Sequence, residues 1–332
     1  MKKRINRYII IGLVFIAMVV ITGCDENVDI EYYEFCIYTM NADGSDLTKV
    51  IDVGATYALF VPNSTMILYR SGKSLYTVNE DGSNNTLITD TLDVKSEPPV
   101  IFSDGSKVVF VSNNDIFIAN INGDNITQLT GTKDIIERQP CLSLDNNEII
   151  YNCECLKKSL YSICRMELYN GIIDTLLTSG NSLSWSKYSI DEEKIFYTKR
   201  GDNAGLFSMY KDGSNIIHLL SEIAVGFPIE VSSAKIVYFY TPNIYIVNYD
   251  GSAISDLGQG YDPHIALFND SQIVYSNNGF QDGDIYIMNN DGTQKGRLAS
   301  YGNNPRFSND GTKIVFPGQY KTKKKVKNYI TN

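Results

Sequence analysis

The sequence is poor in the residues and motifs on which enzymes usually rely. It contains only two histidines, His218 and His264, and it has no Gly-x-Ser-x-Gly elbow, no His-Glu-x-x-His motif and no glycine-rich phosphate-binding loop. Proton transfer in enzymes depends most often on histidine, so the chain offers little for acid–base catalysis. We therefore expect a non-enzymatic protein without a cofactor.

Long apolar runs are also scarce. The only one, Tyr8–Thr22, lies near the N-terminus behind the basic residues Lys2, Lys3, Arg4 and Arg7. Its 15 residues are short for a membrane-spanning helix and are typical of the apolar part of a secretory signal. No second run follows, so the sequence predicts an exported protein whose remaining residues form no membrane-spanning helix.

The signal ends in Ile21-Thr22-Gly23-Cys24, which resembles the bacterial lipobox. The resemblance implies a lipoprotein signal peptide over residues 1–23 and diacylation of the Cys24 thiol. Each buried methylene contributes ~0.8 kcal/mol, so two or more acyl chains would hold the protein on a membrane. We expect lipid anchoring on the periplasmic or cell-surface side of a bacterial membrane. An ordinary signal with an incidental cysteine is the alternative.

Basic residues are scarce in the body of the chain. Residues 24–320 carry 20 basic and 38 acidic side chains, a net charge of −18, which repels phosphate backbones. We therefore expect no nucleic-acid partner. Five lysines gather instead near the C-terminus, where the sequence predicts a disordered Lys-rich tail over residues 318–332.

Cysteines are few, and their number argues against complete disulfide pairing. Besides Cys24 there are five, an odd number, so at least one thiol must stay unpaired within the chain. Cys153 and Cys155 lack the C-x-x-C spacing of zinc sites, and alternate residues of a strand point to opposite faces. We expect buried thiols and no metal. A cross-strand disulfide between Cys164 and either Cys153 or Cys155 is the alternative.

One phrase is abundant. "IYIMNNDGTQKGRL" (285–298) combines an apolar run, an Asp-Gly turn and a short polar strand, and the chain contains seven copies of this phrase, two of them looser. A second phrase, such as "FSDGSKVVFVS" from Phe102 or "FSNDGTKIVF" from Phe307, also occurs seven times. The turn glycines follow one another at intervals of 38 to 48 residues: Gly44, Gly82, Gly123, Gly171, Gly213, Gly251 and Gly292. A period near 40 with four short strands per unit predicts propeller blades.

The chemistry of each unit fits a blade of four strands, which we call A to D from the axis outwards. Strand A follows a proline in most units, and strands B and C are apolar at successive rather than alternate positions. Successive apolar residues indicate a sheet buried on both faces, as when blades pack against one another. Asp-Gly supplies the positive φ of the hairpin between strands C and D. The oxygens of these turns could suit calcium, but no Glu closes the loop, so we expect turns only.

The two ends of the chain complement each other. It starts with the second half of a unit, Cys36–Ile51, and ends with a first half, Pro305–Phe316. Joined, they complete one blade and remove exposed sheet edges. The sequence thus predicts an all-β, seven-bladed β-propeller of four-stranded antiparallel blades over residues 36–317, behind a short tether (24–35). Six blades are the alternative, because the first and third units are degenerate.

The patterns P-x-x-S-x-D-G-x-K-I-x-F and I-Y-x-M-N-x-D-G-S resemble the TolB-type (WD40-like) propeller repeat family. The resemblance covers residues 36–317. It implies a propeller of the cell envelope that docks another protein, because TolB binds a peptidoglycan-associated partner through its propeller. The shared motifs are blade turns, so the resemblance assigns no binding residue.

Candidate binding residues lie in the loops that lead into strand A and converge on one face of the ring. These loops carry Glu97, Arg138, Tyr261 and Asp262, with His264 at the start of a strand A. Loops on a rigid scaffold are where binding usually resides. We expect a membrane-tethered, monomeric protein-binding or scaffold module whose partner is an envelope protein. The alternatives are glycan or small-ligand binding, with Tyr261 stacking on the ligand, and a hydrolase or lyase with its site in the central channel.

Overall fold

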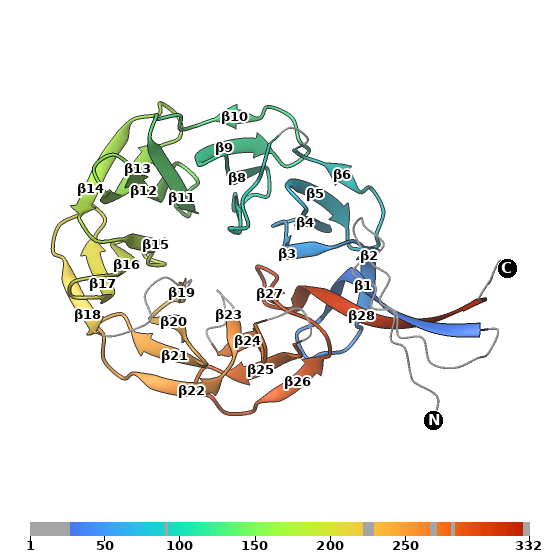
Figure 1. Cartoon of the computed structure of the whole chain (residues 1–332). Helices are drawn as coiled ribbons and strands as arrows, with labels where there is room; N and C mark the ends of the chain where they lie inside the picture. Colours follow the sequence, from blue (N-terminus) through green and yellow to red (C-terminus); the bar gives the residue numbers. More distant parts are fainter. Residues whose placement is uncertain (1–26, 90–91, 222–228, 266–270, 280–282, 328–332) are drawn as a thin grey trace, which may run out of the picture.

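The strands form seven four-stranded sheets arranged around a common axis (Figure 1). The computed structural model describes residues 27–89, 92–221, 229–265, 271–279 and 283–327, and within these ranges it describes side chains from residue 34 to residue 319. All strand pairs are antiparallel. The predicted seven-bladed propeller is confirmed, and the six-bladed alternative is wrong. No helix among the described residues is long and apolar enough to cross a membrane.

Each blade consists of strands A, B, C and D in that order. The first three blades are β3 (Ala55–Phe60), β4 (Met66–Ser71), β5 (Ser74–Asn79), β6 (Thr86–Leu87); β7 (Val100–Ile101), β8 (Lys107–Ser112), β9 (Asp115–Asn120), β10 (Thr127–Gln128); and β11 (Ile135–Leu142), β12 (Glu148–Cys155), β13 (Leu160–Glu167), β14 (Ile173–Ser179). The next three are β15 (Leu183–Tyr188), β16 (Lys194–Lys199), β17 (Gly205–Tyr210), β18 (Ile217–Ser221); β19 (Ile229–Val231), β20 (Lys235–Tyr240), β21 (Asn243–Asn248), β22 (Ser255–Gln259); and β23 (Tyr261–Ile265), β24 (Gln272–Ser276), β25 (Ile285–Asn289), β26 (Gly296–Ala299). The last is β27 (Arg306–Phe307), β28 (Lys313–Lys327), β1 (Asn27–Asn41) and β2 (Thr48–Asp52).

That last blade closes the ring. Strands β27 and β28 come from the C-terminal end of the chain and β1 and β2 from the N-terminal end, as predicted. Strand β1 pairs with β28 without interruption from Asn41↔Lys313 to Asn27↔Lys327. Because β1 and β28 lie in the middle of this blade, neither is left as an exposed edge strand.

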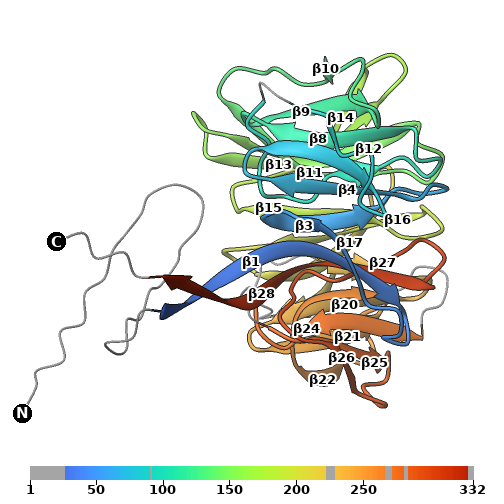
Figure 2. The same cartoon turned by 90° about the vertical axis from the view of Figure 1, so that its right-hand side faces the viewer.

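The closing pair is longer than the sequence predicted. Residues 27–35, expected in the tether, and residues 318–327, expected in a disordered tail, are paired with each other in β1 and β28. They form a two-stranded ribbon that projects from the ring (Figure 2). Once the two strands are paired inside the blade, each further residue pair gives backbone N–H and C=O groups a partner.

Both faces of the inner strands are buried, as the successive apolar positions predicted. In β8, Val108 and Phe110 pack among residues of the blade β3–β6, whereas Val109 and Val111 pack against the blade β11–β14. None of these four side chains is more than 4% exposed. The core therefore consists of layers between neighbouring blades, and this packing keeps the inner strands rigid around the axis.

The repeated Asp-Gly turns connect strands C and D and lie against the preceding blade. In the turn after β5, the Ser83 N–H and hydroxyl both donate to Asp81 Oδ1, at 2.9 and 2.6 Å. Gly82 has a φ of +82°, and a Cβ there would lie 2.5 Å from the Val50 carbonyl oxygen. Only glycine fits this position, so the repeated phrase is part of the architecture.

Candidate functional site

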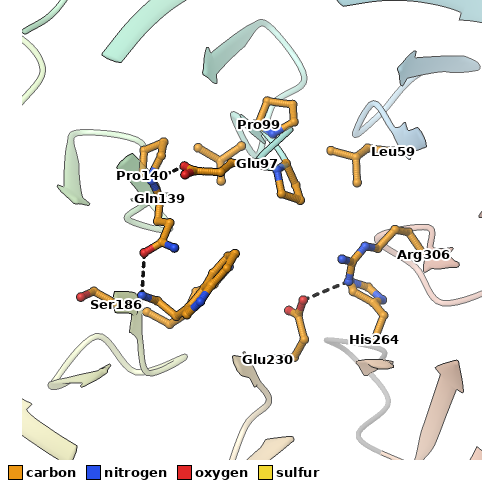
Figure 3. Close-up of a pocket in the computed structure, with 13 residues that line it drawn as sticks. Leu59, Glu97, Pro99, Gln139, Pro140, Ser186, Glu230, His264 and Arg306 are labelled. Carbon is orange, nitrogen blue, oxygen red and sulfur yellow. Dashed lines mark hydrogen bonds and ion pairs between the residues drawn. The ribbon is translucent and has the colours of Figure 1, made fainter. Parts of the chain in front are cut away.

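Each strand A places one side chain at an equivalent register position near the axis. The seven residues each pair with the third residue of strand B: Leu59, Val100, Cys141, Lys187, Glu230, His264 and Arg306. Six of them line a central cavity of about 160 Å³, and the remaining one, Cys141, lines the neighbouring cavity. We call this set the axial ring, part of which is seen in Figure 3.

The axial ring has an apolar half and a polar half. Leu59, Val100 and Cys141 come from three consecutive blades, and the other four residues come from the next four. Within the polar half, Arg306 Nη1 donates to Glu230 Oε1 at 3.0 Å. Burial alone would raise the pKa of Glu230, but Lys187, Arg306 and His264 around it hold that pKa below its usual value.

His264 is a neutral member of the axial ring. Burial lowers its pKa to about 4, although the nearby Glu230 carboxylate acts in the opposite direction. Its Nδ1 accepts a hydrogen bond from the Phe307 N–H at 3.3 Å, which leaves the ring proton on Nε2. The side chain thus links β23 to β27.

A wider cavity of about 510 Å³ opens where the A strands begin, and we call it the strand-A mouth. Its lining includes four aromatic side chains, Tyr57, Trp185, Phe239 and Tyr261, and the carboxyl groups of Glu97 and Asp262. Arg306 is shared between the mouth and the axial cavity. A third cavity, of about 340 Å³, opens at the other end of the A strands, and we call it the far mouth. Its lining includes Phe60, Leu142 and Asn309.

Backbone bulges aim side chains at the strand-A mouth. The register between strands A and B shifts just before the axial ring in four blades, at Ala55/Tyr57, Arg138/Cys141, Ser184/Lys187 and Tyr261/His264. At three of these bulges a residue other than glycine has a positive φ: Gln139 (55°), Trp185 (57°) and Asp262 (49°). Such a conformation costs about 1–3 kcal/mol per residue and is concentrated at functional sites. The other described non-glycine residues with a positive φ lie outside the strands, mostly in turns, whereas these three lie inside strand A.

Two hydrogen bonds tie three blades together at the mouth. Glu97 Oε2 accepts from the Gln139 N–H at 2.8 Å, and Gln139 Oε1 accepts from the Trp185 N–H at 2.9 Å (Figure 3). These bonds hold side chains of three different blades in a fixed relation. A rim that is fixed before binding loses little conformational freedom when a ligand arrives.

The two carboxyl groups of the mouth lie in a poorly solvated place. Burial raises the pKa of Glu97, and the Gln139 N–H together with Arg138 and Lys95 offsets this only in part. Burial also raises the pKa of Asp262, against the opposing effect of Arg306 and the Asn304 N–H. Tyr57 is 2% exposed, and its hydroxyl has no hydrogen-bond partner among the described residues.

The structure brings together most of the binding residues that the sequence suggested. Glu97, Tyr261 and Asp262 line the strand-A mouth, and His264 lies deeper, at the axial cavity. Arg138 lines neither of these cavities and instead forms an ion pair with Glu154 at 2.9 Å.

Sequence reasoning missed several lining residues, above all Trp185, Glu230 and Arg306. Spacing in the sequence could not have found them as a set, because Glu230, His264 and Arg306 lie 5, 8 and 7 residues before the first residue of their strand B. Only the strand register brings these three residues to one equivalent position, the one whose chemistry changes from blade to blade.

The cysteines lie away from the strand-A mouth. All five described cysteines are free, and the Cys153 and Cys164 sulfur atoms are 3.2 Å apart, with the Cys153 thiol donating to Cys164. Cys155 lies opposite Leu160 in the strand pairing. Within the described ranges, no group of three or more His, Cys, Asp or Glu side chains is arranged to hold a metal ion.

Comparison with known proteins finds matches among solved structures. A protein described as TolB from Agrobacterium tumefaciens aligns over 87% of this chain and 99% of its own, at 15% identity and a TM-score of 0.55. TolB from Acinetobacter baumannii aligns over 80% and 63%, at 16% identity and a TM-score of 0.54. The fold is that of a TolB-type propeller. This confirms the fold that the repeat motifs implied.

The comparisons do not decide the activity. Oligogalacturonate lyase from Vibrio parahaemolyticus aligns over 85% of this chain and 97% of its own, at 12% identity and a TM-score of 0.62. At such low identities the similarity shows the fold alone. Searches against protein-family models and against curated proteins find no match.

Proposed function

We propose that this protein is a non-enzymatic binding propeller of the bacterial cell envelope, tethered through Cys24, that docks a segment of another envelope protein in the strand-A mouth. The observation that carries the proposal is the mouth itself: a concave site of about 510 Å³ with four aromatic side chains on a rigid rim. Aromatic residues in concave, preorganised sites are typical anchors of protein interfaces. The fold shared with TolB proteins supports the envelope setting.

Three of the four polar residues of the axial ring favour binding over catalysis because they are already engaged in hydrogen bonds. Arg306 is bonded to Glu230, and the Nδ1 lone pair of His264 accepts a backbone N–H. A general base needs a free acceptor within hydrogen-bond reach of the proton that it removes. These bonds suit residues that hold neighbouring blades together.

The rival is an enzyme that acts on an acidic sugar in the central channel. Two observations favour it: the likeness of the fold to an oligogalacturonate lyase, and the presence of two cations, Lys187 and Arg306, in the axial ring. Carboxylate groups of a substrate could pair with those cations. Turnover of oligogalacturonides by the purified protein, lost in His264→Ala, would establish this rival.

Blocking one end of the channel at a time tests the docking proposal. Ser96 lines the strand-A mouth and Asn309 lines the far mouth, and both are exposed, so Trp at either position should leave the fold intact. We expect crosslinking and pull-down from intact cells to recover one envelope protein with wild type and with Asn309→Trp, but not with Ser96→Trp. Equal recovery with both variants would contradict docking at the strand-A mouth.

A further inference from the structure

We propose that the strand-A mouth receives a cationic side chain, arginine or lysine, from the docking protein. This inference rests on the proposed function and adds the chemistry of the group that enters. It is carried by two carboxyl groups of the mouth that form no ion pair with the described residues, by its aromatic walls and by a buried hydroxyl without a hydrogen-bond partner among those residues.

Among the described residues that line the mouth, two carboxyl groups have no ion-pair partner. Glu97 and Asp262 line it, and neither forms an ion pair within 4 Å with any residue that the structure describes. Arg306, the one cation among the described residues that line the mouth, forms an ion pair with Glu230 at 3.0 Å. An arriving guanidinium or ammonium group would supply the missing counter-charge.

Because both carboxyl groups are buried, a positive charge beside them would stabilise their ionised forms. The pKa values of Glu97 and Asp262 are both raised by burial, so their charged forms are poorly stabilised while the mouth is empty. A cation between them would favour the charged forms. Binding should therefore weaken as the pH falls and these carboxyl groups take up protons.

The walls also suit an arginine side chain. Trp185, Tyr261 and Phe239 line the mouth, with the Phe239 and Tyr261 rings packed together at 4.9 Å between centroids, and a planar guanidinium stacks favourably on aromatic rings. Tyr57 is 98% buried, lines the mouth and its hydroxyl has no hydrogen-bond partner among the described residues, so the hydroxyl would accept an N–H from a ligand group that enters deeply enough to reach it. Guanidinium carries five N–H donors, enough for two carboxylates and this hydroxyl.

The net charge of residues 24–320 also favours a cationic partner. Residues 24–320 carry a net charge of −18, which attracts basic surfaces and speeds their association. A basic segment would thus be drawn to the protein before its side chain enters the mouth.

A matched pair of peptides tests the inference on the full chain in detergent. The probe is a capped Gly-Arg-Gly peptide, and the control is the same peptide with citrulline, which keeps the shape of arginine but has no charge. We expect the arginine peptide to bind about 10-fold more tightly than the citrulline peptide in isothermal titration, which corresponds to about 1.4 kcal/mol. Glu97→Gln and Asp262→Asn should each remove most of this preference without lowering the melting temperature.

The result that would overturn the inference is equal binding of the two peptides, or an arginine preference that survives in both variants. The docking proposal can fail separately. If Ser96→Trp loses the envelope protein while Glu97→Gln and Asp262→Asn keep it, docking stands and the cationic side chain is wrong. If Ser96→Trp keeps the envelope protein, the docking proposal itself is wrong.

Discussion

Glu137 is an acidic residue whose side chain is buried close to a second acidic residue, Asp115. It lies in β11, is 2% exposed, and its Oε2 has no hydrogen-bond partner among the described residues. Burial, together with the nearby Asp115, raises its pKa to about 8. Burial also raises the pKa of Asp115. The Glu137 carboxyl group therefore keeps its proton at neutral pH and shares the site with Asp115.

This pair predicts a pH dependence of stability. The folded pKa of Glu137, about 8, exceeds its ordinary value of 4.5, so the folded state holds a proton that the unfolded state releases. Below about pH 4.5 Glu137 is protonated in both the folded and the unfolded state, so it does not reduce the free energy of unfolding. As the pH rises from there towards 8, the free energy of unfolding falls by at most about 1.4 kcal/mol per pH unit. Urea unfolding at several pH values should show a shallower fall in Glu137→Gln than in wild type.

A matched control for that experiment is Glu154→Gln, which removes a carboxylate from the partly exposed ion pair with Arg138. It should keep the wild-type slope. If Glu137→Gln has the same slope as wild type, Glu137 is ionised in the folded protein and the assignment is wrong.

At the scale of elements, the sequence predicted the strands well because the same local chemistry is repeated in each unit. Asp-Gly turns mark the hairpins, and successive apolar residues mark strands buried on two faces. It could not predict the bulges in strand A, since Gln139 and Trp185 adopt positive φ values without the glycine that usually signals them. The strand-A mouth depends on these bulges, so its residues were only partly predicted.

The repeats also could not predict how far the pairing of β1 with β28 extends. The ribbon pairs residues that belong to no repeated unit, such as Asn27 with Lys327. Its strands share a register because they continue a pairing that starts inside the blade. Local composition suggested an unstructured end, whereas the neighbouring chain supplies the hydrogen-bond partner.

Two truncations test separately how closure of the ring and the projecting ribbon contribute to the melting temperature. A chain that starts at residue 53 lacks β1 and β2 and leaves β28 with an open edge, so we expect aggregation or a melting temperature more than about 10 °C lower. A chain that ends at residue 319 keeps the pairs from Gln319 to Lys313 and should melt close to wild type. Scanning calorimetry and light scattering check both. A monomeric residue-53 chain with an unchanged melting temperature would contradict closure by strand pairing.

The whole molecule combines a closed ring, a strand-A mouth at one end of its channel and a proposed lipid anchor. The seven blades follow directly from the repeats, but the partner does not, because the repeats encode turns and core. What distinguishes this propeller is the set of residues that differ between blades, such as Glu230, His264 and Arg306. Their positions became clear only when the register aligned them.

The anchor leads to a prediction about the whole protein. Cys24→Ser removes the thiol that would be acylated, so the protein should move from the membrane fraction to the soluble fraction after cell lysis. Immunoblotting of the two fractions measures this. Cys36→Ser is a suitable control because Cys36 is buried in β1, and this variant should stay with the membrane. Persistence of Cys24→Ser in the membrane fraction would refute lipidation at this residue.

The most direct test of the central claim, docking at the strand-A mouth, is site-specific photo-crosslinking in living cells. A photoreactive amino acid is placed at Ser96, in the strand-A mouth, and in a second strain at Asn309, in the far mouth. We expect a crosslinked product with one envelope protein from position 96 and none from position 309. The same product from both positions, or a product from position 309 alone, would contradict this claim.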